Sequence, residues 1–193
     1  MKFTKMILTA ALGCTLSAGV FAASPDWNFV EGGYTQMDVD GLRDDQKGFN
    51  FGGSYRFNED FFARGRYTIV DESIAGVDID TDWGEVGLGY IHGVNSTTDV
   101  YGVVALEYLK VDTNAGGDSD TGYSVHAGVK SRIAEQVELF GELGYADIDD
   151  ADISDLSLRA GANYYFTDNL SVGADYRKLD DIDLLSATVR YSF

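Results

Sequence analysis

The fold class is decided by residues 48–57, which read GFNFGGSYRF. Every odd position carries an aromatic residue or glycine, namely Phe49, Phe51, Gly53, Tyr55 and Phe57. The even positions are small or polar, namely Gly48, Asn50, Gly52, Ser54 and Arg56. A repeat of two residues is the pattern of a β-strand with one apolar and one polar face. This segment therefore predicts a strand that separates two different environments.

The same alternation recurs along the rest of the chain. Clear runs lie at 63–69, 85–90, 123–130, 137–145, 158–164, 170–177 and 185–193, and noisier runs lie at 28–37 and 99–111. A length of 193 residues fits a single domain. We predict an all-β fold, an antiparallel up-and-down β-barrel of ten strands, with eight strands as the alternative.

The first residues read as a targeting signal. Lys2 and Lys5 precede an apolar run from Met6 to Leu16, and Val20 and Ala22 suit the positions before a cleavage site. We expect a signal peptide at residues 1–22 and the barrel at residues 23–193. The single cysteine, Cys14, is lost with the signal. The barrel must therefore be stable without disulfides.

Acidic residues concentrate in alternate connections. Twenty of the 32 Asp and Glu residues fall in five segments, 38–47, 71–82, 112–121, 147–155 and 180–183. The other connections are short turns, of which 58–60 and 167–169 are the clearest. Long loops at one end and short turns at the other are typical of outer-membrane barrels. The net charge of −18, or −20 without Lys2 and Lys5, excludes a nucleic-acid partner.

Alternation alone does not say which face points inward, since a soluble lipocalin-like barrel and a membrane barrel both have a period of two. Aromatic residues near the strand ends favour the membrane barrel, because such barrels carry aromatic girdles at both interfaces. At the turn side these are Phe57, Tyr90, Phe166 and Phe193, and at the loop side Tyr34, Phe49, Tyr108, Tyr123, Tyr145 and Tyr176. We therefore predict a transmembrane barrel with its polar face inward.

The predicted inward face carries both signs of charge in near balance, which would allow pairing across a narrow lumen. We expect a lumen network of Arg56, Arg64, Arg66, Glu85, Glu107, His126, Lys130, Arg132, Glu138, Glu142, Arg159, Asp175, Arg177 and Arg190. A barrel of about ten strands lies near the size that its own side chains fill. The sequence thus predicts a plugged lumen or a narrow path at most.

Several segments resemble known small outer-membrane barrels. EGGYTQM at 31–37, GFNFGGSYRF at 48–57 and YGVVALEY at 101–108 resemble strands of OmpX-like barrels. With GYSVHAGVKS at 122–131 they look still closer to the Ax-type small outer-membrane proteins of xanthomonads. The chain end, with Val189, Tyr191 and Phe193 on one face, looks like the assembly signal of such barrels. The resemblance covers the whole mature chain and implies fold and location, with no catalytic residue.

We predict no catalytic residue, no metal site and no cofactor. Ser124, His126 and Glu142 suggest a lipid A-modifying enzyme, but the alternation points Ser124 and His126 into the lumen, away from acyl chains. The segment beginning at Asp112 starts like a calcium loop, yet its twelfth position is Tyr123, where a bidentate Glu is needed. Divalent cations at the acidic loops remain a candidate partner.

The sequence thus predicts a non-enzymatic integral protein of the outer membrane of a Gram-negative bacterium, with a structural, adhesive or surface-interaction role. A narrow porin-like channel is the alternative, and a lipid A-modifying enzyme is a more distant one. The expected partners are outer-membrane lipids, lipopolysaccharide, periplasmic chaperones and the barrel assembly machinery. The acidic loops carry no motif that names a ligand.

Overall fold

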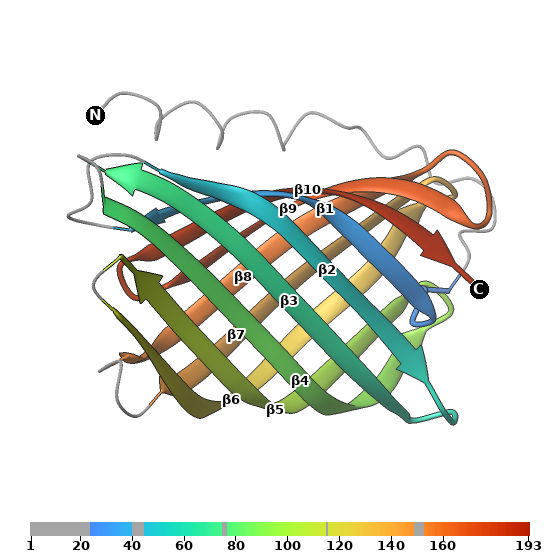
Figure 1. The fold of residues 1–193 in the computed structure, drawn as a ribbon. Coiled ribbons are helices and arrows are strands. Elements are labelled where there is room, and N and C mark those ends of the chain that lie inside the picture. Colours follow the sequence, from blue (N-terminus) through green and yellow to red (C-terminus); the bar gives the residue numbers. More distant parts are fainter. Residues whose placement is uncertain (1–23, 40–44, 75–76, 115, 149–152) are drawn as a thin grey trace.

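The computed structural model describes residues 24–39, 45–74, 77–114, 116–148 and 153–193. The predicted signal peptide, residues 1–22, lies outside the described residues. Ten antiparallel strands close into one barrel in simple up-and-down order, and the last strand pairs with the first (Figure 1). This confirms the predicted all-β fold with ten strands. No helix within the described ranges is long and apolar enough to cross a membrane.

The strands vary in length around the barrel. Their bounds are β1 Phe29–Val39, β2 Gln46–Arg56, β3 Phe61–Ile74, β4 Val77–Asn95, β5 Thr98–Thr113, β6 Gly116–Ala134, β7 Val137–Ile148, β8 Ile153–Tyr165, β9 Leu170–Leu179 and β10 Ile182–Ser192. Each strand hydrogen-bonds to both neighbours, so a closed barrel satisfies the backbone groups that lipid cannot.

The apolar face of the strands points outward, as predicted for a transmembrane barrel. Leu106 and Leu143 are 66% and 65% exposed, whereas Ser124 and Glu138 are fully buried. The aromatic residues predicted for the two girdles are also exposed on the outer wall. An outer wall of exposed leucines would be unfavourable in water, so this surface requires a lipid environment.

Two of the predicted acidic loops are mostly strand. The pairing of β3 with β4 continues up to Ile74 and Val77, and that of β5 with β6 up to Thr113 and Gly116. The prediction of long loops at 71–82 and 112–121 is therefore wrong. Alternation in fact continues through residues 77–83, VDIDTDW, and the acidic composition concealed it.

As a result, four adjacent strands extend beyond the described ends of the neighbouring strands. β2 pairs with β3 only as far as Lys47 and Asp71, and β7 pairs with β6 only from Ile148 and Gly122. The ends of β3, β4, β5 and β6 thus form a small four-stranded sheet above the rim. We call it the projecting sheet; its described residues are 72–74, 77–81, 111–114 and 116–121.

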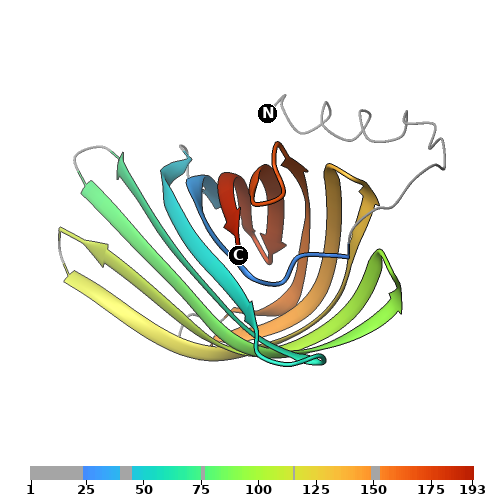
Figure 2. The ribbon, with the colours of Figure 1, turned by 90° about the vertical axis from the view of Figure 1, so that its right-hand side faces the viewer.

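The opposite end of the barrel has short turns and an additional segment. Residues 24–28 precede β1 and cross the barrel mouth on this side (Figure 2). Pro25 and Trp27 are buried there. His92 lies within β4 with its side chain exposed, because β4 continues to Asn95.

The lumen contains two apolar clusters, although the sequence predicts a polar inner face. The inner cluster lies at the turn side and contains Trp27, Phe62, Ile91, Tyr101, Val103 and Ala105. The outer cluster lies at the loop side and contains Met37, Val70, Trp83, Leu109, Ala146, Ile148, Leu179 and Leu184. The charged residues occupy the space between them, so the lumen has three layers.

Candidate functional site: the charged lumen

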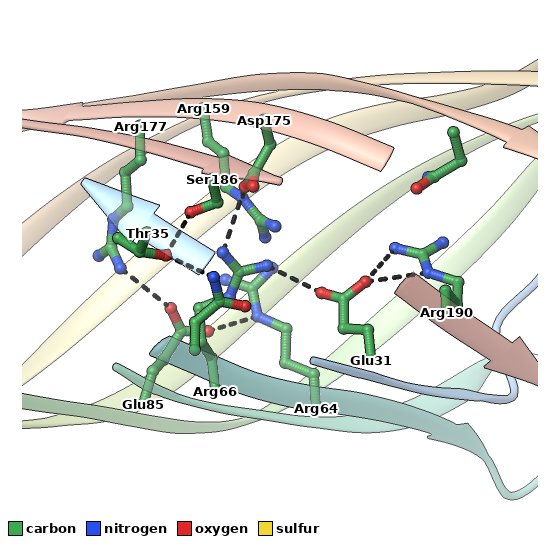
Figure 3. Close-up of polar contacts among 12 residues, drawn as sticks. Glu31, Thr35, Arg64, Arg66, Glu85, Arg159, Asp175, Arg177, Ser186 and Arg190 are labelled. Carbon is green, nitrogen blue, oxygen red and sulfur yellow. Dashed lines mark hydrogen bonds and ion pairs between the residues drawn. The ribbon is translucent and has the colours of Figure 1, made fainter. Parts of the chain in front are cut away.

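Ion pairs cross the middle layer of the lumen between strands that are not neighbours (Figure 3). Arg66 on β3 contacts Glu31 on β1 at 3.1 Å and Asp175 on β9 at 3.2 Å. Arg159 on β8 contacts the same Asp175 at 2.5 Å. Because β3 and β9 are four strands apart, these contacts tie opposite walls together.

Arg64 and Arg177 make a second set of cross-lumen contacts. Arg64 on β3 pairs with Glu85 on β4 at 2.6 Å and with Glu142 on β7 at 2.5 Å. Arg177 on β9 lies 3.7 Å from Glu85 and 3.6 Å from Glu107. Its guanidinium also stacks over Trp83, 4.3 Å from the ring centroid, where the middle layer meets the outer cluster.

Arg190 links the last strand to the first strand and to β7. It donates to Glu31 through Nε at 2.9 Å and Nη2 at 2.7 Å, and to Glu138 through Nη1 at 3.2 Å. The guanidinium lies 3.7 Å from the Phe29 ring centroid. Glu138 is fully buried and also contacts Arg132 at 3.9 Å. Carboxylates buried this completely require such partners.

Lys130 connects the wall to the segment that crosses the mouth. Its Nζ donates to the Asp26 carbonyl at 2.9 Å and lies 4.0 Å from the Trp27 ring centroid. The Trp27 indole donates to Asp99 Oδ2 at 2.7 Å and packs against Phe62 with centroids 4.5 Å apart. These contacts hold residues 24–28 against the turn-side opening.

Arg56 does not join the other charged residues. Its guanidinium donates to the backbone carbonyls of Asn58 and Glu59, in the turn that follows β2. Within the described ranges no ion pair includes it. The alternation correctly places Arg56 on the inward side, but it is the last residue of β2, so its side chain reaches the turn rather than the lumen.

Other polar residues of the lumen are not in the predicted set. Glu31 accepts contacts from two arginines, and Asp99, Asn163 and the Asp26 backbone also take part. Glu31 lies in one of the two segments with noisy alternation. It is nevertheless an even number of residues from Thr35, so the two share the inward face of the strand. Trp27 precedes every periodic segment, so the sequence carries no comparable signal for its burial.

Ser124, His126 and Glu142 do come together inside the barrel. His126 Nε2 lies 2.9 Å from Ser124 Oγ, and His126 Nδ1 lies 3.3 Å from Glu142 Oε1. However, the Ser124 hydroxyl donates to Glu107 Oε1 at 2.7 Å, and Ser124 is completely buried. A hydroxyl whose proton is held by a carboxylate cannot pass it to the histidine, so this arrangement is not that of an activated nucleophile.

Glu85, Glu107 and His126 place possible ligand atoms within 4.8 Å of one another. Both carboxylates, however, face the guanidinium of Arg177 at 3.6–3.7 Å. Arg177 therefore occupies the position of the cation at this cluster, and a divalent ion there would be repelled by it.

The terminal residues Val189, Tyr191 and Phe193 lie on the outer wall. They are 54–59% exposed, and the Phe193 amide donates to the Asn28 carbonyl at 3.0 Å. All three side chains thus form one apolar stripe at the turn-side end of β10.

A closed, cysteine-free barrel with an apolar outer wall and a charged lumen defines an integral outer-membrane β-barrel protein. The family model described as outer membrane protein beta-barrel domain matches residues 6–159, and the chain belongs to this family. The protein is accordingly located in the outer membrane of a Gram-negative bacterium, in contact with its lipids and lipopolysaccharide.

Several relatives and solved structures are similar to this chain. The chain is 29% identical over 170 residues to outer membrane protein X of Escherichia coli K12, covering 82% of this chain and 95% of the relative. It is 26% identical over 174 residues to outer membrane protein X of Enterobacter cloacae, covering 84% and 99%. Ail of Yersinia pestis aligns with a TM-score of 0.42 and 19% identity, covering 88% of this chain and 99% of Ail. Neisserial surface protein A aligns with a TM-score of 0.46 and 18% identity, covering 86% and 96%.

Proposed function

We propose that this protein is a non-enzymatic surface barrel that contacts basic partners outside the cell through its projecting sheet. The lumen network serves to hold the barrel closed and rigid rather than to conduct. The observation that carries the proposal is the projecting sheet itself, since a barrel with a purely structural role has no need of strands beyond the rim.

The charge of the projecting sheet supports a basic partner. Asp80 on β4 lies directly opposite Asp112 on β5, which pairs with Lys110, and directly opposite Asp71 on β3 at the base of the projecting sheet. Like charges in such positions destabilise a sheet by a few tenths of a kcal/mol or more. A positively charged surface would relieve this repulsion and would be attracted from a distance.

The edge of the projecting sheet supports a protein partner. Residues 116–121 of β6 pair with β5 on one side and have no partner strand on the other among the described residues. An open strand edge offers backbone groups to an extended segment of another chain. Asp118 lies on this edge, so an extended segment with lysine or arginine would fit best.

The lumen layers support the absence of solute transport and of lipid chemistry. The outer cluster is at most 8% exposed, and below it the ion pairs cross the lumen. The Ser124 hydroxyl is held by Glu107 beneath this cluster, out of reach of an acyl chain. A channel or a lipid A-modifying enzyme would need one of these barriers to open.

We also propose that residues 1–22 are removed on export, and that Val189, Tyr191 and Phe193 are recognised by the barrel assembly machinery after delivery by periplasmic chaperones. Divalent cations are expected to collect at the acidic rim without a defined site. The accessible stripe on the last strand supports the assembly step.

The test uses Gram-negative host cells that display the barrel, with fluorescently labelled cytochrome c as the basic protein probe. Replacing Asp78, Asp80, Asp118 and Asp120 by Asn should lower the bound probe about threefold at low salt, because surface attraction depends on these charges. The matched control changes four turn-side acids, Glu59, Asp60, Glu135 and Asp168, to Gln or Asn, and should bind like the wild type.

Equal probe binding by displaying cells and by cells without the barrel would refute the surface role. The channel alternative is tested separately in planar bilayers, where the wild-type barrel should give no steady current above the bare membrane. A steady current would favour the channel alternative, whatever the cell-binding result.

A further inference from the structure

A hollow of about 60 Å³ lies in the lumen between the inner cluster and the cross-lumen ion pairs. Trp27, Phe62 and Tyr101 form its turn-side wall. A water molecule needs roughly 10–15 Å³ of such space, so the hollow has room for about four to six waters. A phosphate or sulfate ion is of comparable size.

The charged lining of the hollow is predominantly positive. Five cationic side chains face it, namely Arg64, Arg66, Lys130, Arg159 and Arg190. Only two carboxylates, Glu31 and Glu85, face it as well. The other carboxylates that pair with these arginines, Glu138, Glu142 and Asp175, do not line the hollow.

Two of the cations have donors to spare. Arg159 donates to Asp175 through Nε, and its two Nη nitrogens donate to no other side chain within the described residues. Its side chain is 17% exposed, the highest value among the ion-paired arginines. Lys130 uses one of its three donors on the Asp26 carbonyl. Because the barrel is closed, the remaining donor nitrogens of Arg159 and Lys130 face the hollow.

We propose that this hollow binds a small oxyanion of the phosphate and sulfate class. Arg159 supplies paired N–H donors that match two oxygens of such an ion, and Lys130 supplies a third donor from the turn side. Separation from bulk water strengthens these bonds relative to those made in solution. The site is independent of the projecting sheet.

The segment that crosses the mouth governs access to this site. Trp27 closes the hollow on the turn side, and its ring and Lys130 are in contact. An anion therefore enters from the periplasmic side when residues 24–28 move away. A short segment outside the strand pairing opens at lower free energy than the closed sheet does.

The experiment titrates sodium phosphate into the full mature barrel, refolded in a maltoside detergent that contains no phosphate, at ionic strength held constant with sodium chloride. Isothermal titration calorimetry should give one phosphate per barrel. Arg159→Gln and Lys130→Gln should each weaken binding at least tenfold, whereas the rim control Lys178→Gln should leave the affinity unchanged. Heat-dependent gel migration verifies that each variant is folded.

Arg159→Gln should still fold because Asp175 keeps its contact with Arg66. If it does not fold, Lys130→Gln carries the test, since Lys130 contacts a carbonyl and two aromatic rings rather than a carboxylate. Absence of phosphate binding by the wild type would overturn the site. So would unchanged binding in the folded lumen variants, or an equal loss in Lys178→Gln.

Discussion

The middle layer of the lumen and the outer cluster use successive inward positions of the same strands in opposite ways. On β9, Arg177 is followed two residues later by Leu179, and on β5, Glu107 is followed by Leu109. The charged residue of each pair reaches an opposite charge on a distant strand, whereas the leucine packs against neighbours in the outer cluster. Inward residues in this barrel are therefore stabilised either by an ionic partner or by apolar packing. Substitutions in the two layers should destabilise the barrel for different reasons.

The largest expected effect is in the middle layer. Arg190→Met removes three hydrogen bonds from Glu31 and Glu138, both of which are buried. Removing one partner of a buried ion pair costs about 3–5 kcal/mol because a charge is left without compensation. Urea titration of folding into phospholipid vesicles should show this loss.

A second variant tests whether an unpaired charge causes the loss of stability in Arg190→Met. In Arg190→Met with Glu138→Gln, the carboxylate whose one remaining ion pair within the described residues is the 3.9 Å contact with Arg132 is neutral, and part of the stability should return. If the double variant is less stable than Arg190→Met alone, unpaired charge is not the cause of the loss.

A smaller effect is expected in the outer cluster. Leu179 is fully buried, so Leu179→Ala should leave a cavity and cost about 3 kcal/mol. No charge is stranded, and the barrel should keep its heat-dependent migration. The same titration measures the loss, and Leu170→Ala on the lipid-facing side of β9 is the matched control with a smaller expected cost. Equal costs at both positions would contradict a packed cluster inside the lumen.

The smallest effect is expected at the rim. Lys178 and Asp183 lie 3.2 Å apart, but their side chains are 46% and 37% exposed. Exposed pairs contribute about 0.2–1 kcal/mol at most, since water and salt screen them. Lys178→Ala should therefore change the urea midpoint very little. A loss as large as that of Arg190→Met would show that exposure does not explain the difference between rim and lumen.

The ten strands and the outward apolar face could be predicted because the alternation of apolar and polar residues is visible within the sequence of each strand. The ends of the strands could not be predicted as well. Acidic residues such as Asp78 and Asp80 are common in loops, yet here they continue β4 into the projecting sheet. Hydrogen bonds to β3 and β5 outweigh the weak local preference against strand.

The charged residues of the lumen could be named in part, but their partners could not. Local sequence places Arg66 on the inward side of β3. It does not indicate that Arg66 meets Asp175, because that contact depends on the tilt and stagger of strands around the closed barrel. The hollow behind Arg159 has the same origin, since it is the space that these cross-lumen contacts leave.

The sequence alone therefore determined the two faces and the membrane location and favoured ten strands over eight, since alternation and aromatic position are local properties of each strand. The tertiary structure decided the rest: the three layers of the lumen, the placement of Trp27 across the mouth and the projecting sheet. Each of these depends on which residues from distant strands face one another. Residues of distant strands face one another only after the first and last strands have paired and closed the barrel.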